Sequence, residues 1–292
     1  MQADKMDLNE EEKQLCKELR DRIADLKVEE FRVMDFNMIR FLRAREMNLD
    51  KSEEMFRKYI AWRLENNIDN ACSWDVPQDL KESVPYKIVG QSLSGGLVLY
   101  AHVGIWDPQV AQGRYEELMK LAFHELENLT QFTKHYSLQR KYFSKMVVII
   151  NLEGLSFAHV STVDYIRALV SLLKAFEAYY PESLKVAFLI NAPWVFSILW
   201  SIAKPFISTA THERLRFLGG EKETWKEEIM QYIAEDQFPI CVGGTLPDNY
   251  EMVYEDGKVF GRFNTETEPN DNEFKDASPG PAAIAESLDA LD

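Results

Sequence analysis

The chain has 292 residues, enough for one large domain or two modest ones. Hydrophobic residues make up 46% of it and aromatic residues 12%, so it can build a sizeable core. Its formal net charge of −15 argues against nucleic acid as a partner, because nucleic-acid binding needs a basic face.

The start of the chain and its cysteines indicate a cellular compartment. Residues 1–13 (MQADKMDLNEEEK) are polar and acidic, so we expect no signal peptide, and Gln2 excludes N-myristoylation. Cys16, Cys72 and Cys241 are odd in number and far apart, as expected of free thiols in a reducing compartment. Because no apolar run approaches a transmembrane length, these features together predict a cytoplasmic protein.

Residues 1–74 are predicted to form a helical subdomain. The apolar periodicity predicts one helix at about 8–28, a second at about 34–46, and a third that follows the turn at 48–50 and ends near residue 66. No strand pattern separates these three helices.

Residues 75–250 alternate between apolar strands and helices. We expect strands at 97–103, 146–152 and 184–190, a short element at 215–218, and helices at 114–134, 162–179 and 224–233. Apolar strands that alternate with helices predict a mixed, mostly parallel sheet with helical cover. The expected fold is therefore α/β, with a three-helix subdomain in front of the sheet domain.

The helix expected at residues 194–206 is apolar on nearly every side. Its polar residues Ser197, Ser201 and Lys204 form one narrow stripe, whereas an ordinary surface helix has the opposite pattern. Pro205 ends it too early to span a bilayer. It is either a buried core helix or a movable wall that closes an apolar cavity and meets a membrane surface.

After Tyr250 the chain loses its apolar periodicity. Residues 251–292 contain 11 acidic and 3 basic residues. Such a composition buries too little apolar surface to fold, so we expect an acidic, disordered tail. This tail is a candidate contact for protein partners.

The sequence carries no enzyme signature. It has no GxxxxGK[ST] or GxGxxG phosphate loop and no GxSxG elbow. Residues 124–128 (HELEN) resemble the HExxH zinc motif, but Asn128 stands where the second histidine belongs. We therefore expect no catalytic residue, no metal, no enzymatic activity and no cofactor other than a bound hydrophobic ligand.

Polar side chains come close together after the apolar helix. Ser208 or Thr209 can cap a short helix, and Thr211 and Arg214 lie three residues apart on one face of it. A hydroxyl beside a guanidinium suits a phosphate oxygen. The alternative is that Arg214 is a solvated charge and Thr211 an ordinary cap.

Several short motifs follow one another along the chain. They are FLRAR (41–45), Trp62-Arg63, NLEG (151–154), YYPE (179–182), INAP (190–193), KPF (204–206) and Gly243-Gly244. In order and spacing, over roughly residues 36–247, they resemble the Sec14-like CRAL-TRIO lipid-binding proteins. The resemblance implies a helical N-terminal subdomain, an α/β domain that encloses an apolar lipid cavity, and a mobile gate helix at 194–206.

The resemblance also implies a headgroup site. Family members that exchange phosphatidylinositol hold its headgroup with the last Arg of FLRAR, the Glu of YPE, and a Thr and a Lys after KPF. In this sequence these positions are Arg45, Glu182, Thr211 and Arg214. Glu182 could instead be a structural partner of Arg45. Ser183 stands where the yeast-like pattern has Arg.

The family's choline-binding positions are apolar in this chain. Two Tyr, a Ser and a Thr of that pattern correspond to Ile88, Leu99, Met146 and Val148, so nothing there would hold a choline headgroup. The side chains expected to line the cavity are Leu99, Met146, Val148, Ile150, Phe188 and Ile190.

A lipid carrier of this kind must open at a membrane. A diacyl lipid has about 30 methylenes, and moving it into water costs on the order of 20 kcal/mol at about 0.8 kcal/mol each. Apolar gate residues would therefore seal the cavity or enter the bilayer interface. The expected gate residues are Trp194, Phe196, Ile198, Leu199, Trp200, Ile202, Lys204 and Phe206.

Three functions remain open at this point. The favoured one is a phosphatidylinositol-binding transfer protein that contacts membrane surfaces transiently. The apolar substitutions also suit a carrier of a small hydrophobe, such as a tocopherol, a retinoid or a sterol precursor. The third is a regulatory scaffold for a small GTPase or kinase that acts through the acidic tail. We expect no C-terminal β-sandwich domain, because residues 251–292 are too few for one.

Overall fold

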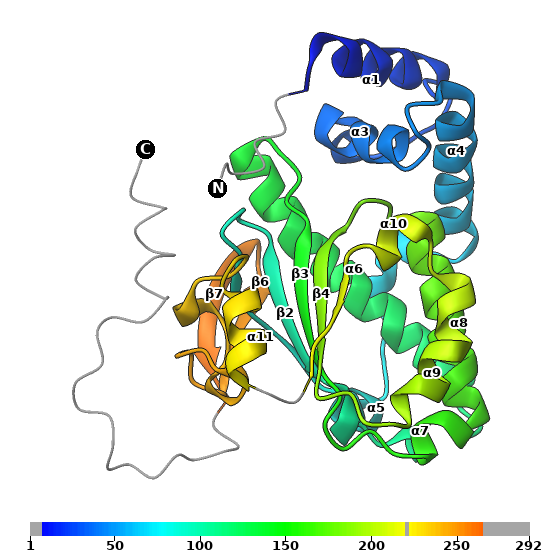
Figure 1. The fold of residues 1–292 in the computed structure, drawn as a ribbon. Coiled ribbons are helices and arrows are strands. Elements are labelled where there is room, and N and C mark those ends of the chain that lie inside the picture. Colours follow the sequence, from blue (N-terminus) through cyan, green and yellow to red (C-terminus); the bar gives the residue numbers. More distant parts are fainter. Residues whose placement is uncertain (1–7, 220–221, 265–292) are drawn as a thin grey trace.

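A computed structural model describes residues 8–219 and 222–264 of the chain (Figure 1). The first helices gather at one end of the molecule, beyond the edge of a central sheet. They are α1 (Glu10–Arg22), α2 (Glu30–Val33), α3 (Asp35–Arg43) and α4 (Leu49–Glu65), followed by the 3-10 helix η1 (Ile68–Ser73). The helix expected at 34–46 ends early, because the backbone turns left-handed at Glu46 and Met47, with φ of 53° and 61°.

A compact apolar core joins these helices. Leu19 of α1, Met38 and Leu42 of α3, and Phe56 of α4 are fully buried in one cluster. Asn9 begins α1 with a capping box, in which its side chain accepts a hydrogen bond from the backbone N–H three residues later. The helical end therefore has its own core.

The central sheet has five strands in the order β1-β2-β3-β4-β5. The strands are β1 (Tyr86–Gln91), β2 (Leu97–His102), β3 (Met146–Asn151), β4 (Leu184–Ile190) and β5 (Leu215–Phe217). β1 pairs antiparallel with β2, and the other pairs are parallel. This arrangement confirms the predicted α/β class with a mixed, mostly parallel sheet.

Helices cover both faces of the sheet (Figure 1). One face carries α6 (Tyr115–Arg140), α8 (Val163–Tyr179) and α9 (Phe196–Ala203), and the other carries α11 (Lys222–Ile229). Shorter elements connect them: α5 (Gln78–Ser83), η2 (Val103–Ile105), η3 (Pro108–Ala111), α7 (Ala158–Ser161), η4 (Lys204–Phe206), α10 (Thr209–His212), η5 (Glu235–Gln237) and η6 (Ile240–Val242). Within the described ranges no helix is both long enough and apolar enough to cross a bilayer.

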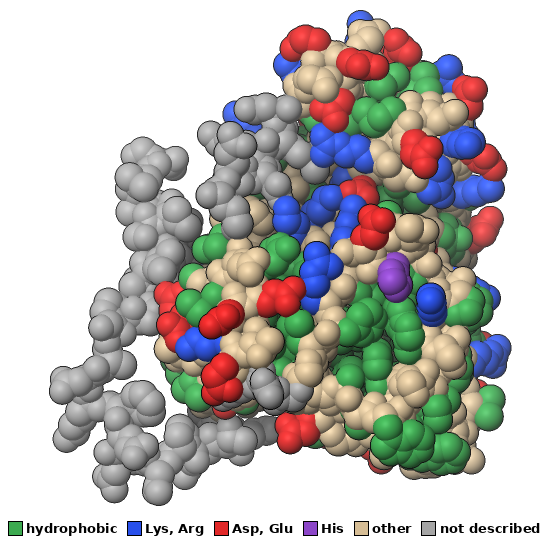
Figure 2. Space-filling model, viewed as in Figure 1, with side chains coloured by type: hydrophobic (Ala, Val, Ile, Leu, Met, Phe, Trp, Pro, Cys, Tyr) green, Lys and Arg blue, Asp and Glu red, His purple; other side chains and the backbone are tan. Residues whose placement is uncertain are grey.

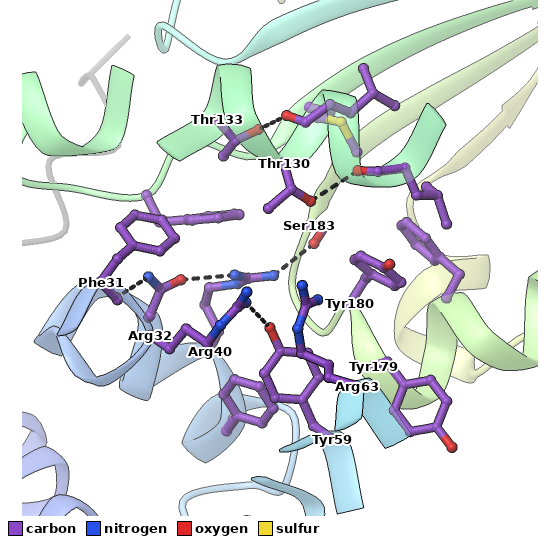
Figure 3. Close-up of a pocket in the computed structure, with 17 residues that line it drawn as sticks. Phe31, Arg32, Arg40, Tyr59, Arg63, Thr130, Thr133, Tyr179, Tyr180 and Ser183 are labelled. Atoms are coloured by element: carbon purple, nitrogen blue, oxygen red, sulfur yellow. Dashed lines mark hydrogen bonds between the residues drawn. The ribbon is translucent and has the colours of Figure 1, made fainter. Parts of the chain in front are cut away.

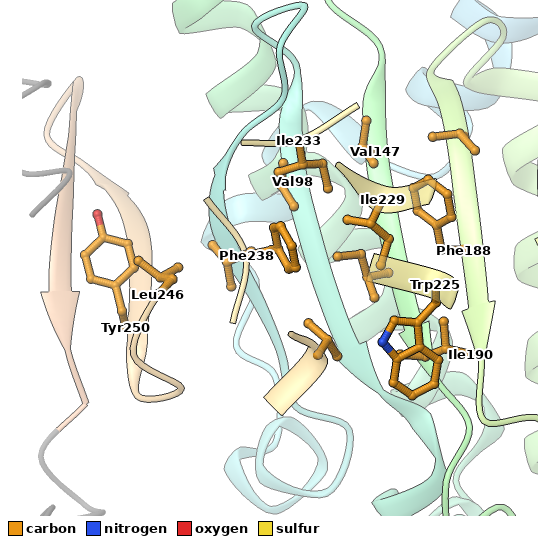
Figure 4. Close-up of a cluster of buried hydrophobic side chains, with 14 residues drawn as sticks. Val98, Val147, Phe188, Ile190, Trp225, Ile229, Ile233, Phe238, Leu246 and Tyr250 are labelled. Carbon is orange, nitrogen blue, oxygen red and sulfur yellow. The ribbon is translucent and has the colours of Figure 1, made fainter. Parts of the chain in front are cut away.

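Two of the expected cavity residues lie on the wrong face of the sheet. Phe188 and Ile190 are fully buried against Trp225 and Ile229 of α11 (Figure 4). The neighbouring Leu189 faces the α8 and α9 side. Every position of β4 except Lys185 is apolar, since both faces are covered, so alternation alone could not tell the faces apart.

The predicted disordered tail is wrong for residues 251–263. β6 (Tyr250–Glu255) and β7 (Lys258–Phe263) form an antiparallel hairpin. Asp256 and Gly257 make its two-residue turn with positive φ at both positions, the backbone that an Asp-Gly turn favours. The Tyr254 ring packs against Phe132 of α6 at 5.6 Å between centroids. The remaining expected tail, 265–292, lies outside the described residues.

Candidate lipid-binding site

An apolar cavity of about 220 Å³ lies between the sheet and the helices α6 and α8. Its lining is almost entirely hydrocarbon. Its polar edge is at Tyr86, whose hydroxyl donates to Glu125 Oε2 at 2.5 Å. Burial, with the Glu125 charge, raises the pKa of Tyr86 well above its usual value. Apolar lining residues include Leu99 and Ala101 of β2, Leu126 and Leu129 of α6, and Ala168 and Leu172 of α8.

The remaining predicted cavity residues lie on the same sheet face as Leu99. Met146 borders a second, smaller cavity. Val148 and Ile150 are half-buried beside Leu189, in the cluster that packs under α9. The cavity is therefore bounded by β2, and the face of β3 and β4 is covered by α9.

The predicted gate helix has one buried and one open side. Val195 and Leu199 pack on the sheet with Leu189. Trp194, just before α9, is 75% exposed, and Trp200 is half-buried at 5.0 Å from the Phe217 ring. The other expected gate residues divide likewise: Phe196, Ile198, Ile202 and Phe206 are half-buried, and Lys204 is exposed. Figure 2 shows the hydrophobic surface on this side of the molecule.

The cavity described here is not closed by α9. Its walls come from other elements, so in this conformation α9 is a cover for β3 and β4. The core-helix interpretation thus holds for one side of α9, while the exposed Trp194 just before the helix fits the interpretation of a membrane-facing wall. A movement of α9 stays a prediction.

Three charged side chains meet at the amino ends of the parallel strands. Lys145 directly precedes β3, Arg214 directly precedes β5, and Glu182 lies in the turn before β4. Because these ends share one edge of the sheet, the three groups come together. Arg214 Nη2 donates to both carboxylate oxygens of Glu182, at 2.7 and 2.9 Å, and Lys145 Nζ donates to Oε2. We call Lys145, Glu182 and Arg214 the headgroup cluster, because two of the three are among the headgroup residues predicted from the sequence.

The headgroup cluster is part-buried and carries a net charge of +1. Burial alone would raise the pKa of Glu182, but the hydrogen bonds and charges of Lys145 and Arg214 outweigh it and hold the pKa below its usual value. Burial lowers the pKa of Lys145 more than Glu182 raises it. Figure 2 shows Lys and Arg side chains gathered where these strands meet the N-terminal helices.

Thr211 belongs to the same region. Ser208 begins α10, where its side chain accepts from the Thr211 N–H at 3.2 Å, and its hydroxyl donates to Thr211 Oγ1 at 3.1 Å. The Thr211 hydroxyl has no acceptor among the described residues, so its proton is available to a ligand. The Arg214 N–H bonds the Thr211 carbonyl at 3.0 Å, which fixes their spacing.

Arg45 does not join the other three predicted headgroup residues. Its Nη1 donates to the Ala44 carbonyl, and it lines a surface hollow beside α4 and Tyr179. The arginine that reaches the YPE turn is Arg40, whose Nε donates to the Pro181 carbonyl at 3.0 Å. Arg40 is on α3, whereas Arg45 follows the end of that helix and so points elsewhere.

Sequence reasoning missed Lys145 and Arg40. Lys145 could have been found from its place, because it directly precedes a buried strand as Arg214 does. Arg40 carries no such signal, since any cation on a helix surface looks alike in sequence. No group of three or more potential metal ligands occurs within the part of the chain that the structure describes.

The fold and these motifs have counterparts among known proteins. A family model of the CRAL/TRIO domain matches residues 81–244. The chain belongs to the CRAL/TRIO domain family. This confirms the predicted resemblance, and membership supports a lipid-binding or lipid-transfer protein.

Relatives of this CRAL/TRIO chain are considerably longer than the matched region. Protein real-time of Anopheles gambiae is 29% identical over 216 residues, which cover 71% of this chain and 31% of that protein. A CRAL-TRIO domain-containing protein of Caenorhabditis elegans is 28% identical over 217 residues, covering 72% and 30%. The matched part of the chain thus spans about a third of the length of these relatives.

A solved structure shares the fold. The crystal structure of Sfh5 superposes with a TM-score of 0.58 at 16% sequence identity, over 75% of this chain and 82% of that one. This likeness supports the architecture of helical end, mixed sheet and covering helices.

Proposed function

We propose that this CRAL/TRIO protein binds a lipid, with phosphatidylinositol as the favoured ligand, and exchanges it at membrane surfaces. The observation that carries lipid binding is the 220 Å³ cavity, whose lining is almost wholly apolar. An apolar cavity with few polar groups at its edge is the usual form of a site for a hydrophobic ligand.

The headgroup cluster supports an inositol phosphate. Arg214 bonds Glu182 through Nη2 alone, and within the described residues its Nε and Nη1 have no other partner. Each of these two groups can donate a charge-assisted hydrogen bond to a phosphate oxygen. Lys145 and Thr211 add an ammonium and a hydroxyl, and Glu182 can accept from inositol hydroxyls.

A diacyl lipid needs more room than the cavity offers. Its 220 Å³ is below the roughly 300–1,000 Å³ typical of ligand pockets, so a second chain requires a moved wall. Displacing α9 would uncover the half-buried Val148 and Ile150. The exposed Trp194 then meets the bilayer interface, a position that tryptophan favours.

Mass spectrometry of lipids extracted from the purified protein tests the ligand directly. We expect phosphatidylinositol in the wild type and its loss in Arg214→Ala and Lys145→Ala, together with loss of transfer between vesicles. Arg216→Ala is the matched control, because Arg216 lies two positions further on and pairs with Glu228 on α11. Equal phosphatidylinositol in all four proteins contradicts the headgroup assignment.

A second candidate is a carrier of a small hydrophobe. The cavity volume favours it, and so does the Tyr86–Glu125 pair, because a carboxylate at the cavity edge accepts from a hydroxyl and repels an anion. The same mass spectra distinguish this candidate from the phosphatidylinositol carrier. A neutral alcohol bound in place of phosphatidylinositol would establish the small-hydrophobe function.

A protein partner that binds the acidic tail is the remaining candidate. Deleting residues 265–292 tests it without touching the hairpin. Vesicle transfer that survives the deletion, with loss of a partner, supports the scaffold role.

A further inference from the structure

A small cavity of about 50 Å³ separates the N-terminal helices from the lipid domain. Figure 3 shows three guanidinium groups, those of Arg32, Arg40 and Arg63, converging beside it. Tyr59 and Ser183 also line it, and both are buried. We call this space the Arg40 pocket.

Arg32 and Arg63 have acidic partners. Arg63 donates to both carboxylate oxygens of Glu127, at 3.0 and 2.7 Å, and through Nε to Asp69 at 2.6 Å. Arg32 donates to the same Asp69 oxygen at 2.8 Å and to the Tyr59 hydroxyl at 2.6 Å. Two carboxylates therefore balance these two cations.

The partners of Arg40 within the described ranges are all neutral. It donates to the Pro181 carbonyl, to Asn37 Oδ1 at 2.9 Å and to Ser183 Oγ at 2.8 Å, and its guanidinium lies 3.7 Å from the Phe143 ring centroid. No acidic side chain among the described residues forms an ion pair with it. Burial lowers the pKa of Arg40 to about 10, and the more distant charge of Glu182 offsets this only in part.

Nearby acidic groups do not neutralise Arg40. Glu182 is held by the two cations of the headgroup cluster. Glu29, at 3.9 Å from Arg32, pairs with Lys134. The charges around the pocket therefore sum to +1.

Four hydrogen-bond donors remain for a ligand in this pocket. A guanidinium has five N–H groups, and Arg40 uses three of them. The hydroxyls of Tyr59 and Ser183 each accept from an arginine, and the described residues offer neither of them an acceptor. A surplus of donors with a surplus positive charge is the chemistry of an oxyanion site.

We propose that the Arg40 pocket binds an oxyanion, a phosphate or a carboxylate, through Arg40, Tyr59 and Ser183. The volume suits such a group, because one water needs about 10–15 Å³ of cavity by the same measure. The bound ion bridges α3 and α4 to the turn before β4, so it ties the helical end to the lipid domain.

The oxyanion has two possible sources. Leu126 and Leu129 of α6 line both the Arg40 pocket and the 220 Å³ apolar cavity. A chain attached to the oxyanion can therefore run between the two spaces, as a long-chain carboxylate would. A free phosphate would fill the pocket alone.

Titration calorimetry of the full chain with sodium phosphate and, separately, with oleate tests the proposal. We expect at least one of these two probes to bind. Tyr59→Phe and Ser183→Ala should each weaken that binding about tenfold, because each variant loses one hydrogen bond to a charged group. Both variants remove a hydroxyl and keep the side-chain shape, so we expect urea unfolding to change little. Arg40→Lys keeps the charge and loses the fork, and should bind more weakly still.

The outcomes separate the two sources. Oleate binding that phosphate displaces identifies an amphiphile, and binding of phosphate alone identifies a free ion; either supports the site. Absence of binding by both probes, or affinities equal to wild type in Tyr59→Phe and Ser183→Ala, overturns it. The inference does not rest on phosphatidylinositol. The variant Arg214→Ala separates the two proposals. Loss of vesicle transfer in this variant tests the headgroup cluster, and phosphate binding that persists in it tests the Arg40 pocket.

Discussion

Arg63 of α4 and Glu127 of α6 form a bidentate ion pair whose side chains are only 2% and 3% exposed. Burial alone would lower the pKa of Arg63, but the Glu127 carboxylate reverses this and raises it. The Tyr180 hydroxyl donates to the same carboxylate at 2.8 Å. One buried acid thus joins the helical end of the molecule to α6 and to the end of α8.

Removing one member of the Arg63–Glu127 pair should lower the stability of the protein. Glu127→Ala leaves the buried Arg63 guanidinium with Asp69 as its one acidic partner among the described residues and strips both Nη groups of their acceptor, so we expect the free energy of unfolding to fall by about 3 kcal/mol. Urea denaturation measures it. Glu54→Ala breaks the exposed Lys58–Glu54 pair and should leave the urea midpoint nearly unchanged. Similar midpoints for both variants would contradict a structural role of the buried pair.

Stability should depend on pH through Glu182. Its pKa is lower in the folded protein than its usual 4.5, so the charged form stabilises the fold above that value. This contribution is lost as the pH falls below 4.5 and through the folded-state pKa. Urea midpoints measured from pH 7 to pH 3 should therefore fall less steeply in Glu182→Gln than in wild type. Parallel curves would show that the carboxylate adds nothing.

The stacked rings of Trp62 and Tyr179 should couple the helical end to α8. Their centroids are 4.1 Å apart and their planes 7° from parallel. A double-mutant cycle with Trp62→Ala and Tyr179→Ala should give a coupling free energy of about 0.5–1.5 kcal/mol beyond the separate losses. If the two losses simply add, the stack contributes only buried area.

The exposed Trp194 should contribute to membrane binding and not to the stability of the fold. Because its side chain is 75% exposed, Trp194→Ser should leave the urea midpoint unchanged and reduce binding to lipid vesicles in flotation assays. Val195→Ser, at a buried neighbour, should do the opposite by lowering the midpoint. Unchanged vesicle binding by Trp194→Ser would remove this residue from the membrane contact.

The variant Trp200→Asp tests whether α9 is more than a core helix. Trp200 is half-buried between Phe196 and Phe217, so its loss costs some stability. We expect vesicle-to-vesicle lipid transfer to decrease by a larger factor than the folded fraction measured by circular dichroism. A loss of transfer that merely follows the loss of folded protein would favour the core interpretation.

Much of the architecture could be predicted from local patterns. The strand at 184–190 has the predicted bounds, because an apolar run between Pro181 and Pro193 leaves little choice of ends. The hairpin at 250–263 was also within reach. Asp256-Gly257 between two short segments that contain apolar residues, 252–254 and 259–260, is a strong turn signal, and the acidic composition of residues 251–292 obscured it.

The candidate site was predictable only in part. The separation of Thr211 and Arg214 is local, so sequence placed them together. The contact between Arg214 and Glu182 joins residues 32 positions apart in the chain, and only the resemblance to a family suggested it. Nothing local indicated that Lys145 would complete the cluster.

By itself the sequence determined the main N-terminal helices, most of the elements between residues 97 and 233, their order and the parallel character of the sheet, since these follow from periodicity and breakers within a few residues. The antiparallel strand β1 and the β6–β7 hairpin were not among the predicted elements. The tertiary structure alone decided which face Phe188 and Ile190 occupy, that Arg40 and not Arg45 reaches the turn before β4, and that α9 does not close the cavity. Those outcomes depend on strand register, helix ends and packing between distant segments, and the free energies that set them arise only when the segments meet.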